Sequence, residues 1–159
     1  MSDVRQQVQQ AIDQLVESGA ERGLQVAVYR HGEQVVDAVA GVADPATGRP
    51  VASDTVFYNR HPARHHGRGP VRLGQDVRRH RRRRAEVFGM PTTWGLGYGI
   101  GGPGGDAQDA PTVFGLGGVG GSFACGDTAS GIAWAVTKNR VSNDFSTSTR
   151  LGQLITGAL

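Results

Sequence analysis

The chain has 159 residues, of which 38% are hydrophobic and 25 are glycine, and this length suits one domain. No stretch is long and apolar enough to span a bilayer, and the polar N-terminus is unlike a secretory signal, so we expect a cytoplasmic protein. The single cysteine, Cys125, excludes an internal disulfide and a zinc site built from cysteines. The net charge of +3 is unevenly spread, because residues 60–84 hold ten arginines and one acidic residue while the rest of the chain is acidic.

The first 40 residues predict an amphipathic helix followed by a β-hairpin. Residues 3–18 carry one apolar stripe at helical spacing, formed by Val4, Val8, Ile12, Leu15 and Val16. Residues 24–30 and 34–40 are rich in β-branched side chains, and His31-Gly32 between them is a turn signal. A turn-rich loop with Pro45, Gly48 and Pro50 follows.

Residues 60–86 have a different composition, dominated by Arg, His, Pro and Gly, and we expect a disordered basic insert there. Six arginines could bind polyanions through phosphate contacts: Arg78, Arg79, Arg81, Arg82, Arg83 and Arg84. The segment 60–84 has no aromatic residue for base stacking, so such binding would be nonspecific. The histidines of the segment (His61, His65, His66 and His80) have one carboxylate and no cysteine beside them, so we expect no metal site.

Residues 87–159 predict about three strands and a C-terminal helix. Glycine alternates with large residues over 94–101, and a strand is predicted over 132–136, with Ile132, Trp134 and Val136 on one face. "GLGGVG" at 115–120 fits the Gly-x-Gly-x-x-Gly pattern, but a strand rather than a helix follows it. A dinucleotide site needs the helix N-terminus to hold the pyrophosphate, so we expect no cofactor.

Both flanks of the basic insert carry a family resemblance. "GLQVAVYRHGEQVVDAVAGVADPATGRPVASDTVFYN" and "WGLGYGIGG…FGLGGVGGSFACGDTASGIAWAVTKNR" resemble the two ends of the β-lactamase-related serine hydrolases. This group includes class C β-lactamases, penicillin-binding proteins and family VIII carboxylesterases. The resemblance implies an α+β fold in which terminal helices cover one face of an antiparallel, about five-stranded sheet. It also implies three segments: 1–59 and 87–159 as the two ends of the domain, and 60–86 in place of the helical domain.

The family's reaction needs a serine and, one helical turn later, a lysine that helps to take its proton. Counting from Phe57, these positions fall on His61 and Arg64, and arginine is too basic to act as a base. The third motif, which lines the substrate strand, maps to Leu116, Gly117 and Gly118 and has lost its polar side chain. We therefore expect an inactive, truncated or frameshifted copy whose ancestral substrate was a small ester or β-lactam.

Two alternatives remain open from the sequence. One is a residual esterase that uses Ser122, although no base lies near this serine in the sequence. The other is a basic module that binds nucleic acid nonspecifically. Without the helical domain, we also expect the apolar face of strand 132–136 to be exposed to water, which would make the protein marginally stable.

Overall fold

The computed structural model describes residues 2–58, 83–87, 90–95, 98–101, 111–118, 120–142 and 144–159. The elements are α1 (Ser2–Glu17), β1 (Gly23–Arg30), β2 (Glu33–Asp44), β3 (Arg49–Pro50), β4 (Arg83–Val87), β5 (Met90–Gly95), β6 (Tyr98–Ile100), β7 (Val113–Gly117), β8 (Phe123–Asp127), β9 (Ile132–Lys138) and α3 (Ser146–Ala158). No helix in these ranges is long and apolar enough to cross a membrane.

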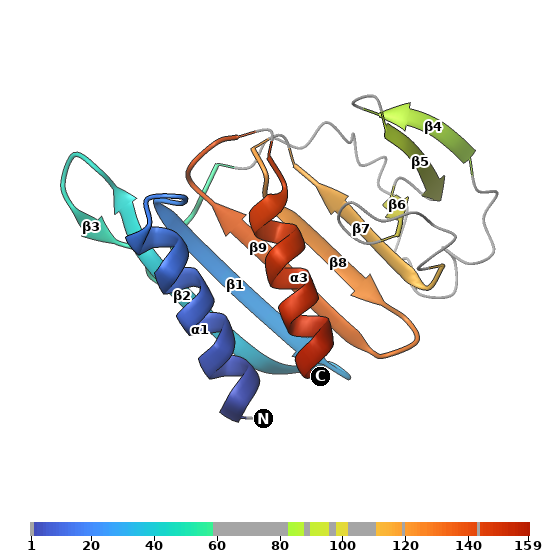
Figure 1. Ribbon diagram of the computed structural model, residues 1–159, viewed down its shortest axis with the longest axis horizontal. Coiled ribbons are helices and arrows are strands. Elements are labelled where there is room, and N and C mark those ends of the chain that lie inside the picture. The colour runs from blue at the N-terminus through green and yellow to red at the C-terminus, as the bar shows by residue number, and fades with distance from the viewer. Residues whose placement is uncertain are drawn as a thin grey trace.

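The strands in the described ranges form one antiparallel sheet in the order β3-β2-β1-β9-β8-β7-β6-β5-β4 (Figure 1). The α+β class is as expected, but the expected number of about five strands is wrong. The structure adds β4, β7 and the two-residue β3, and the predicted glycine-alternating strand is divided between β5 and β6. The N-terminal hairpin meets the C-terminal strands where β1 pairs with β9, from Leu24 opposite Lys138 to Arg30 opposite Ile132.

The predicted hairpin is confirmed, and its turn has the backbone that a tight two-residue connection requires. β1 and β2 pair from Gly23 opposite Gly41 to Arg30 opposite Glu33. The two residues between the strands, His31 and Gly32, both have positive φ, at 51° and 88°. A turn with two positive φ angles matches the right-handed twist of the flanking strands. A positive φ costs conformational energy at His31 but not at Gly32, because glycine has no Cβ.

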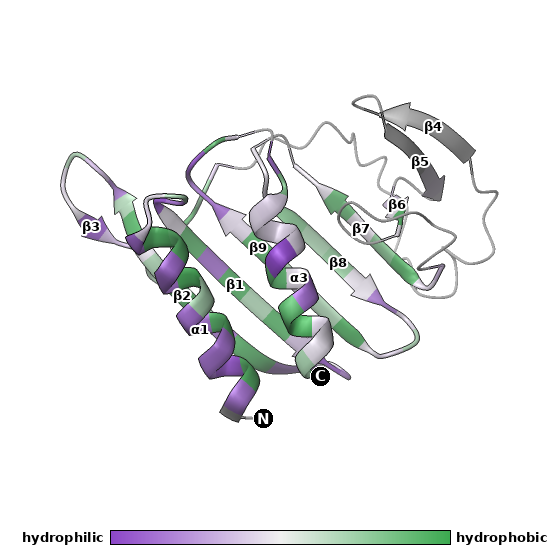
Figure 2. Ribbon diagram, in the orientation of Figure 1, coloured by the Kyte–Doolittle hydropathy of each residue, from purple (hydrophilic) through white to green (hydrophobic). Residues whose placement is uncertain are grey.

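The core lies between one face of the sheet and the two helices, which lie side by side on that face (Figure 1). Its fully buried aliphatic side chains come from five elements and include Ile12, Leu24, Val26, Val28, Val36, Val136, Leu151 and Ile155. The outward side of α1 is largely hydrophilic (Figure 2), as expected for a helix that buries one stripe. Packing of both helices against β1, β2 and β9 therefore makes one continuous core.

The prediction that strand 132–136 exposes its apolar face is wrong. Ile132, Trp134 and Val136 are buried, because they belong to the face that the helices cover. The opposite face of β9 carries Ala133, which is exposed, and Ala135, which is half-buried. The apolar side chains are therefore covered by the helices, and small residues lie on the other face.

The expected disordered insert is contradicted at its C-terminal end. Residues 83–86 belong to β4, which pairs with β5 from Arg83 opposite Trp94 to Val87 opposite Met90. Backbone pairing with the glycine-containing segment that follows gives this stretch a partner that local composition does not reveal. Residues 60–82 lie outside the described residues.

Two glycines of α3 provide a matched test of how closely this helix approaches the sheet. A Cβ added at Gly152 would lie 2.6 Å from Cζ2 of Trp134, whereas one added at Gly157 would meet nothing within 4 Å. We expect Gly152→Ala to lower the free energy of unfolding by roughly 1–3 kcal/mol through overpacking, despite the better helix propensity of alanine. Gly157→Ala should leave it unchanged or raise it by a few tenths, to about 1 kcal/mol at most. Urea denaturation followed by circular dichroism measures both, and an equally stable Gly152→Ala variant would contradict the packing.

Candidate functional site

Leu116 and Gly117 are the last two residues of β7, and Gly118 follows the strand. Each of the three residues has different surroundings. Leu116 lies opposite Ala124 of β8, on the face away from the helices, and is half-buried. A Cβ at Gly117 would lie 2.7 Å from Cε1 of Phe145, so an aromatic ring fills the space beside this glycine on the helix side. The N–H of Gly118 donates to the carbonyl of Ser122 across the following turn, at 2.8 Å. Packing and the turn therefore explain the two glycines, while the role of this segment as a substrate strand stays a prediction.

Ser122 follows two glycines with positive φ, Gly120 at 126° and Gly121 at 85°, and leads into β8. Its side chain is buried, and its Oγ accepts a hydrogen bond from the backbone N–H of Lys138 at 3.3 Å. A nucleophilic hydroxyl needs a base within hydrogen-bond reach and access for the substrate. Ser122 instead joins the start of β8 to the end of β9.

The strongest electrostatic feature is an ion pair between Lys138 and Glu21, whose side chains are only 2% and 3% exposed. Lys138 Nζ lies 2.6 Å from Glu21 Oε1 and also donates to Ser142 Oγ at 3.0 Å. Thr147 Oγ1, in the first turn of α3, donates to the same carboxylate oxygen at 2.7 Å. The cluster therefore joins the α1–β1 loop, β9, the following loop and α3.

This cluster holds separate segments of the chain together. Lys138 is the chain's single lysine, and its Nζ donates to a carboxylate and to a hydroxyl that stabilise its charge in place. The second carboxylate oxygen, Glu21 Oε2, is buried without a hydrogen-bond partner among the described residues. Breaking such a buried pair leaves an uncompensated charge, so it constrains how the four segments meet.

Asn139, the next residue, holds the end of β9 to β2. Its Nδ2 donates to the carbonyls of Val42 at 2.7 Å and Ala43 at 3.2 Å, and its backbone N–H donates to Gly23 O. The glycine at position 23 is required here, since a Cβ would lie 2.6 Å from Val42 O. An asparagine at the end of a strand thus fastens the edge of the hairpin to the C-terminal half.

Sequence reasoning missed the pairing of Lys138 with Glu21, although part of the signal was present. The alternation that buries Ile132, Trp134 and Val136 also places Lys138 on the helix-covered face. A lysine on a buried face needs a compensating acid. The identity of that acid was not visible, because Glu21 lies 117 positions earlier in the chain.

Cys125 is not a nucleophile in this structure. It lies half-buried on β8 and packs against the core. Burial raises the pKa of the Cys125 thiol to about 12, and the nearby charge of Asp127 acts in the same direction. The reactive thiolate is therefore scarce near neutral pH.

Several predicted site residues lie outside the described residues. These are the expected serine and lysine positions, His61 and Arg64, the histidines considered as metal ligands, and Arg78, Arg79, Arg81 and Arg82. Arg83 and Arg84 lie on β4, where only the backbone is described. Polyanion binding by these arginines stays a prediction. In the part of the chain that the structure describes, no three His, Cys, Asp or Glu side chains gather as a metal site would require.

Comparison with known proteins gives one family match. A family model described as Beta-lactamase matches residues 8–59, from within α1 to just beyond the loop after β3. This part of the chain is similar to β-lactamases. The match includes both strands of the hairpin and the "DTVF" phrase that leads to the expected serine position.

One solved structure is similar in part. It is described as the crystal structure of a family VIII carboxylesterase, with 23% sequence identity and a TM-score of 0.43. The similarity covers 54% of this chain and 24% of that one, so the chain matches about a quarter of the esterase's length. No curated protein matches.

The buried ion pair gives a testable expectation. Lys138→Met leaves the Glu21 carboxylate buried and unpaired, so we expect the free energy of unfolding to fall by about 3–5 kcal/mol. The double variant Lys138→Met with Glu21→Gln removes both charges and should recover part of this loss. Denaturant titration of the unchanged protein, both single variants and the double variant measures the coupling. A loss below about 1 kcal/mol in the Lys138→Met variant would show that the pair is not needed.

The shifted thiol gives a second expectation. At about pH 8 the raised pKa leaves roughly a thousandfold fewer thiolates at Cys125 than an ordinary thiol has, so the folded protein should react very slowly with iodoacetamide. The folded state keeps the proton, and the rate should rise only as the pH approaches the folded-state pKa. Mass spectrometry follows the labelling, and the same protein in concentrated urea is the control. Equal rates in both states would contradict the burial of this thiol.

Proposed function

We propose that this chain is a β-lactamase-related serine hydrolase without acyl-transfer activity. The observation that carries the proposal is the pair of residues at the expected Ser-x-x-Lys positions, His61 and Arg64. An acyl-enzyme needs a hydroxyl that can hold the acyl group and an amine that can release and take a proton. Neither group stands there, so the ancestral hydrolysis of a small ester or β-lactam is lost.

The buried serine and lysine of the C-terminal half support this proposal. Ser122 accepts from the backbone of β9, and Lys138 is bound to Glu21 and Ser142. Both side chains are buried within a cluster that holds segments together. A residual esterase built on Ser122 would therefore lack both an available base and an open approach for the substrate.

We further propose that residues 60–86 replace the catalytic segment and do not belong to the original reading frame. Arg, His, Pro, Gly and Ala dominate when GC-rich DNA is read out of frame, and ten of the chain's arginines lie in 60–84. The flanking segments 1–59 and 87–159 would then be the two ends of one domain. Their pairing through β1 and β9 supports this division.

The inactivity proposal predicts no enzymatic turnover of a chromogenic carboxylic ester or of a chromogenic cephalosporin. The rate with purified protein should equal the buffer rate within the noise of absorbance measurements. Ser122→Ala should leave that background unchanged, with folding of both proteins checked by circular dichroism. Turnover that Ser122→Ala abolishes would refute the proposal and support the residual esterase.

The reading-frame proposal is tested on the coding DNA rather than on the protein. Between codons 55 and 90, translation in one of the other two frames should yield a Ser-x-x-Lys box at the position that follows "DTVF". The absence of this box from both frames would exclude a simple frameshift. The outcome is independent of whether the present chain hydrolyses esters.

A further inference from the structure

The outer edge of β2 is only partly paired. β2 pairs with β1 along most of its length, but on its other side β3 pairs only at Val42 and Asp44. Over residues 33–41, no strand among the described residues pairs with that outer side. In Figure 1 this edge lies beside α1, at the end of the sheet opposite β4. A sheet edge with unpaired backbone groups can accept another strand.

The hydrogen bonds around β2 identify which backbone groups point outward. Gly41 O accepts from Val51 N–H, and Val39 O accepts from Gln9 Nε2, both at 3.0 Å. Alternate residues of an antiparallel strand direct their N–H and C=O groups to the same side. The backbone N–H and C=O of Asp37 therefore also point to the outer side of β2. Its N–H and C=O, together with the N–H of Val39, have no partner among the described residues. The bond from Gln9 shows that this edge already binds an amide donor.

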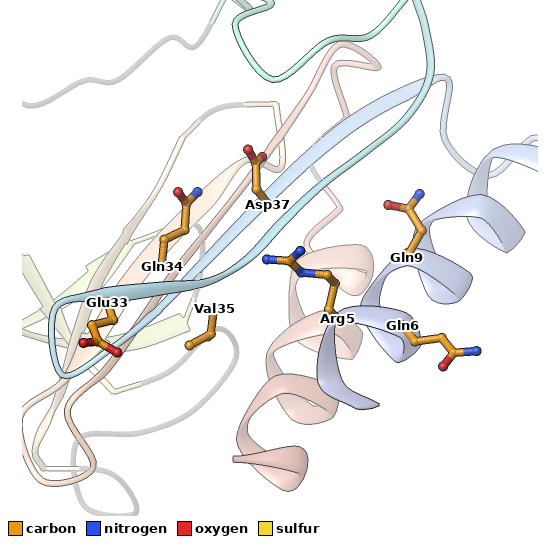
Figure 3. A pocket seen from close by; sticks show the side chains of 7 residues that line it. All are labelled: Arg5, Gln6, Gln9, Glu33, Gln34, Val35 and Asp37. Carbon is orange, nitrogen blue, oxygen red and sulfur yellow. The ribbon is translucent and has the colours of Figure 1, made fainter. Parts of the chain in front are cut away.

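A groove runs along this edge between β2 and α1. It has a volume of about 670 Å³ and is lined by Arg5, Gln6 and Gln9 on α1 and by Glu33, Gln34, Val35 and Asp37 on β2. Figure 3 shows Arg5 extending from α1 toward β2. Six of the seven lining residues have a polar or charged side chain, and the glutamine amides among them are suited to backbone hydrogen bonds.

The charge of the groove favours a basic strand over a second copy of this chain. Its charged residues are Arg5, Glu33 and Asp37, which give a net charge of −1. Glu33 and Asp37 are exposed and form no ion pair with a described residue. A second copy that paired through the same edge would bring the same two acids toward them, and like charges across a strand pair are destabilising. A strand with basic side chains has the complementary charge.

We propose that the outer edge of β2 over residues 33–39 accepts an extended basic peptide as an additional antiparallel strand. The peptide continues the row that β3 begins at Val42, and its main chain exchanges hydrogen bonds with Asp37. Its basic side chains face Glu33 and Asp37, and α1 forms the wall of the groove. The groove is lined by none of the residues on which the proposed loss of acyl transfer rests, so this proposal does not depend on that loss.

The test uses a fluorescein-labelled peptide of sequence Thr-Lys-Val-Lys-Val-Lys-Thr and the full chain. Fluorescence anisotropy measures the dissociation constant, and amide chemical shifts locate the contact. We expect shifts concentrated in residues 33–39 and about tenfold weaker binding when the backbone nitrogens facing β2 are methylated. This methylated peptide keeps every charge, so it isolates the main-chain hydrogen bonds.

Two variants separate hydrogen bonding from charge at one position. Asp37→Pro removes the outward N–H and the charge and should weaken binding about tenfold or more, whereas Asp37→Asn removes only the charge and should weaken it two- to threefold. If Asp37→Pro fails to fold, the methylated peptide on the unchanged protein decides. Equal binding of both peptides, shifts outside residues 33–39, or no binding at millimolar peptide would each overturn the proposal.

Discussion

The pairing of β1 with β9 is the contact on which the rest of the structure depends. It joins segments more than a hundred residues apart and places Val26 and Val28 opposite Val136 and Trp134. These side chains all point to the face that α1 and α3 cover, so one ladder creates both the sheet and the floor of the core. Because apolar burial is the main favourable term in folding, the helices have a stable place to pack only once this ladder exists.

Polar side chains at one end of the β1–β9 pairing stabilise the two strands in this arrangement. Leu24 lies opposite Lys138, where the apolar face of β9 ends and the buried ion pair with Glu21 begins. Ser122, Asn139 and Thr147 add hydrogen bonds around that point. Groups that elsewhere could perform chemistry are here hydrogen-bonded to other parts of the chain and hold those parts together.

Among the described residues, the face of β9 that α1 and α3 do not cover carries few large apolar side chains. Both helices lie on one face, and the opposite face of β9 carries alanines rather than large apolar residues. Asp37 and Glu33 stand at the outer edge, where charged side chains discourage unselective strand pairing. The same charges give that edge a preference, because a charged edge repels its own copies and attracts strands of opposite sign.

Local patterns in the sequence determined the helix of α1, the β1–β2 hairpin with its His31-Gly32 turn, and which face of β9 is apolar. Each depends on spacing within a few residues, and that spacing is dictated by helix and strand periodicity. The prediction that His61 and Arg64 stand at the serine and lysine positions of the serine hydrolase motif also comes from the sequence, since it concerns residue identity alone. Tertiary structure decided which face the helices cover, that Glu21 is the partner of Lys138, that residues 83–87 form a strand, and that Gly117 makes room for Phe145. These features join residues that are distant in sequence or depend on a neighbouring strand, and local periodicity carries no information about such partners.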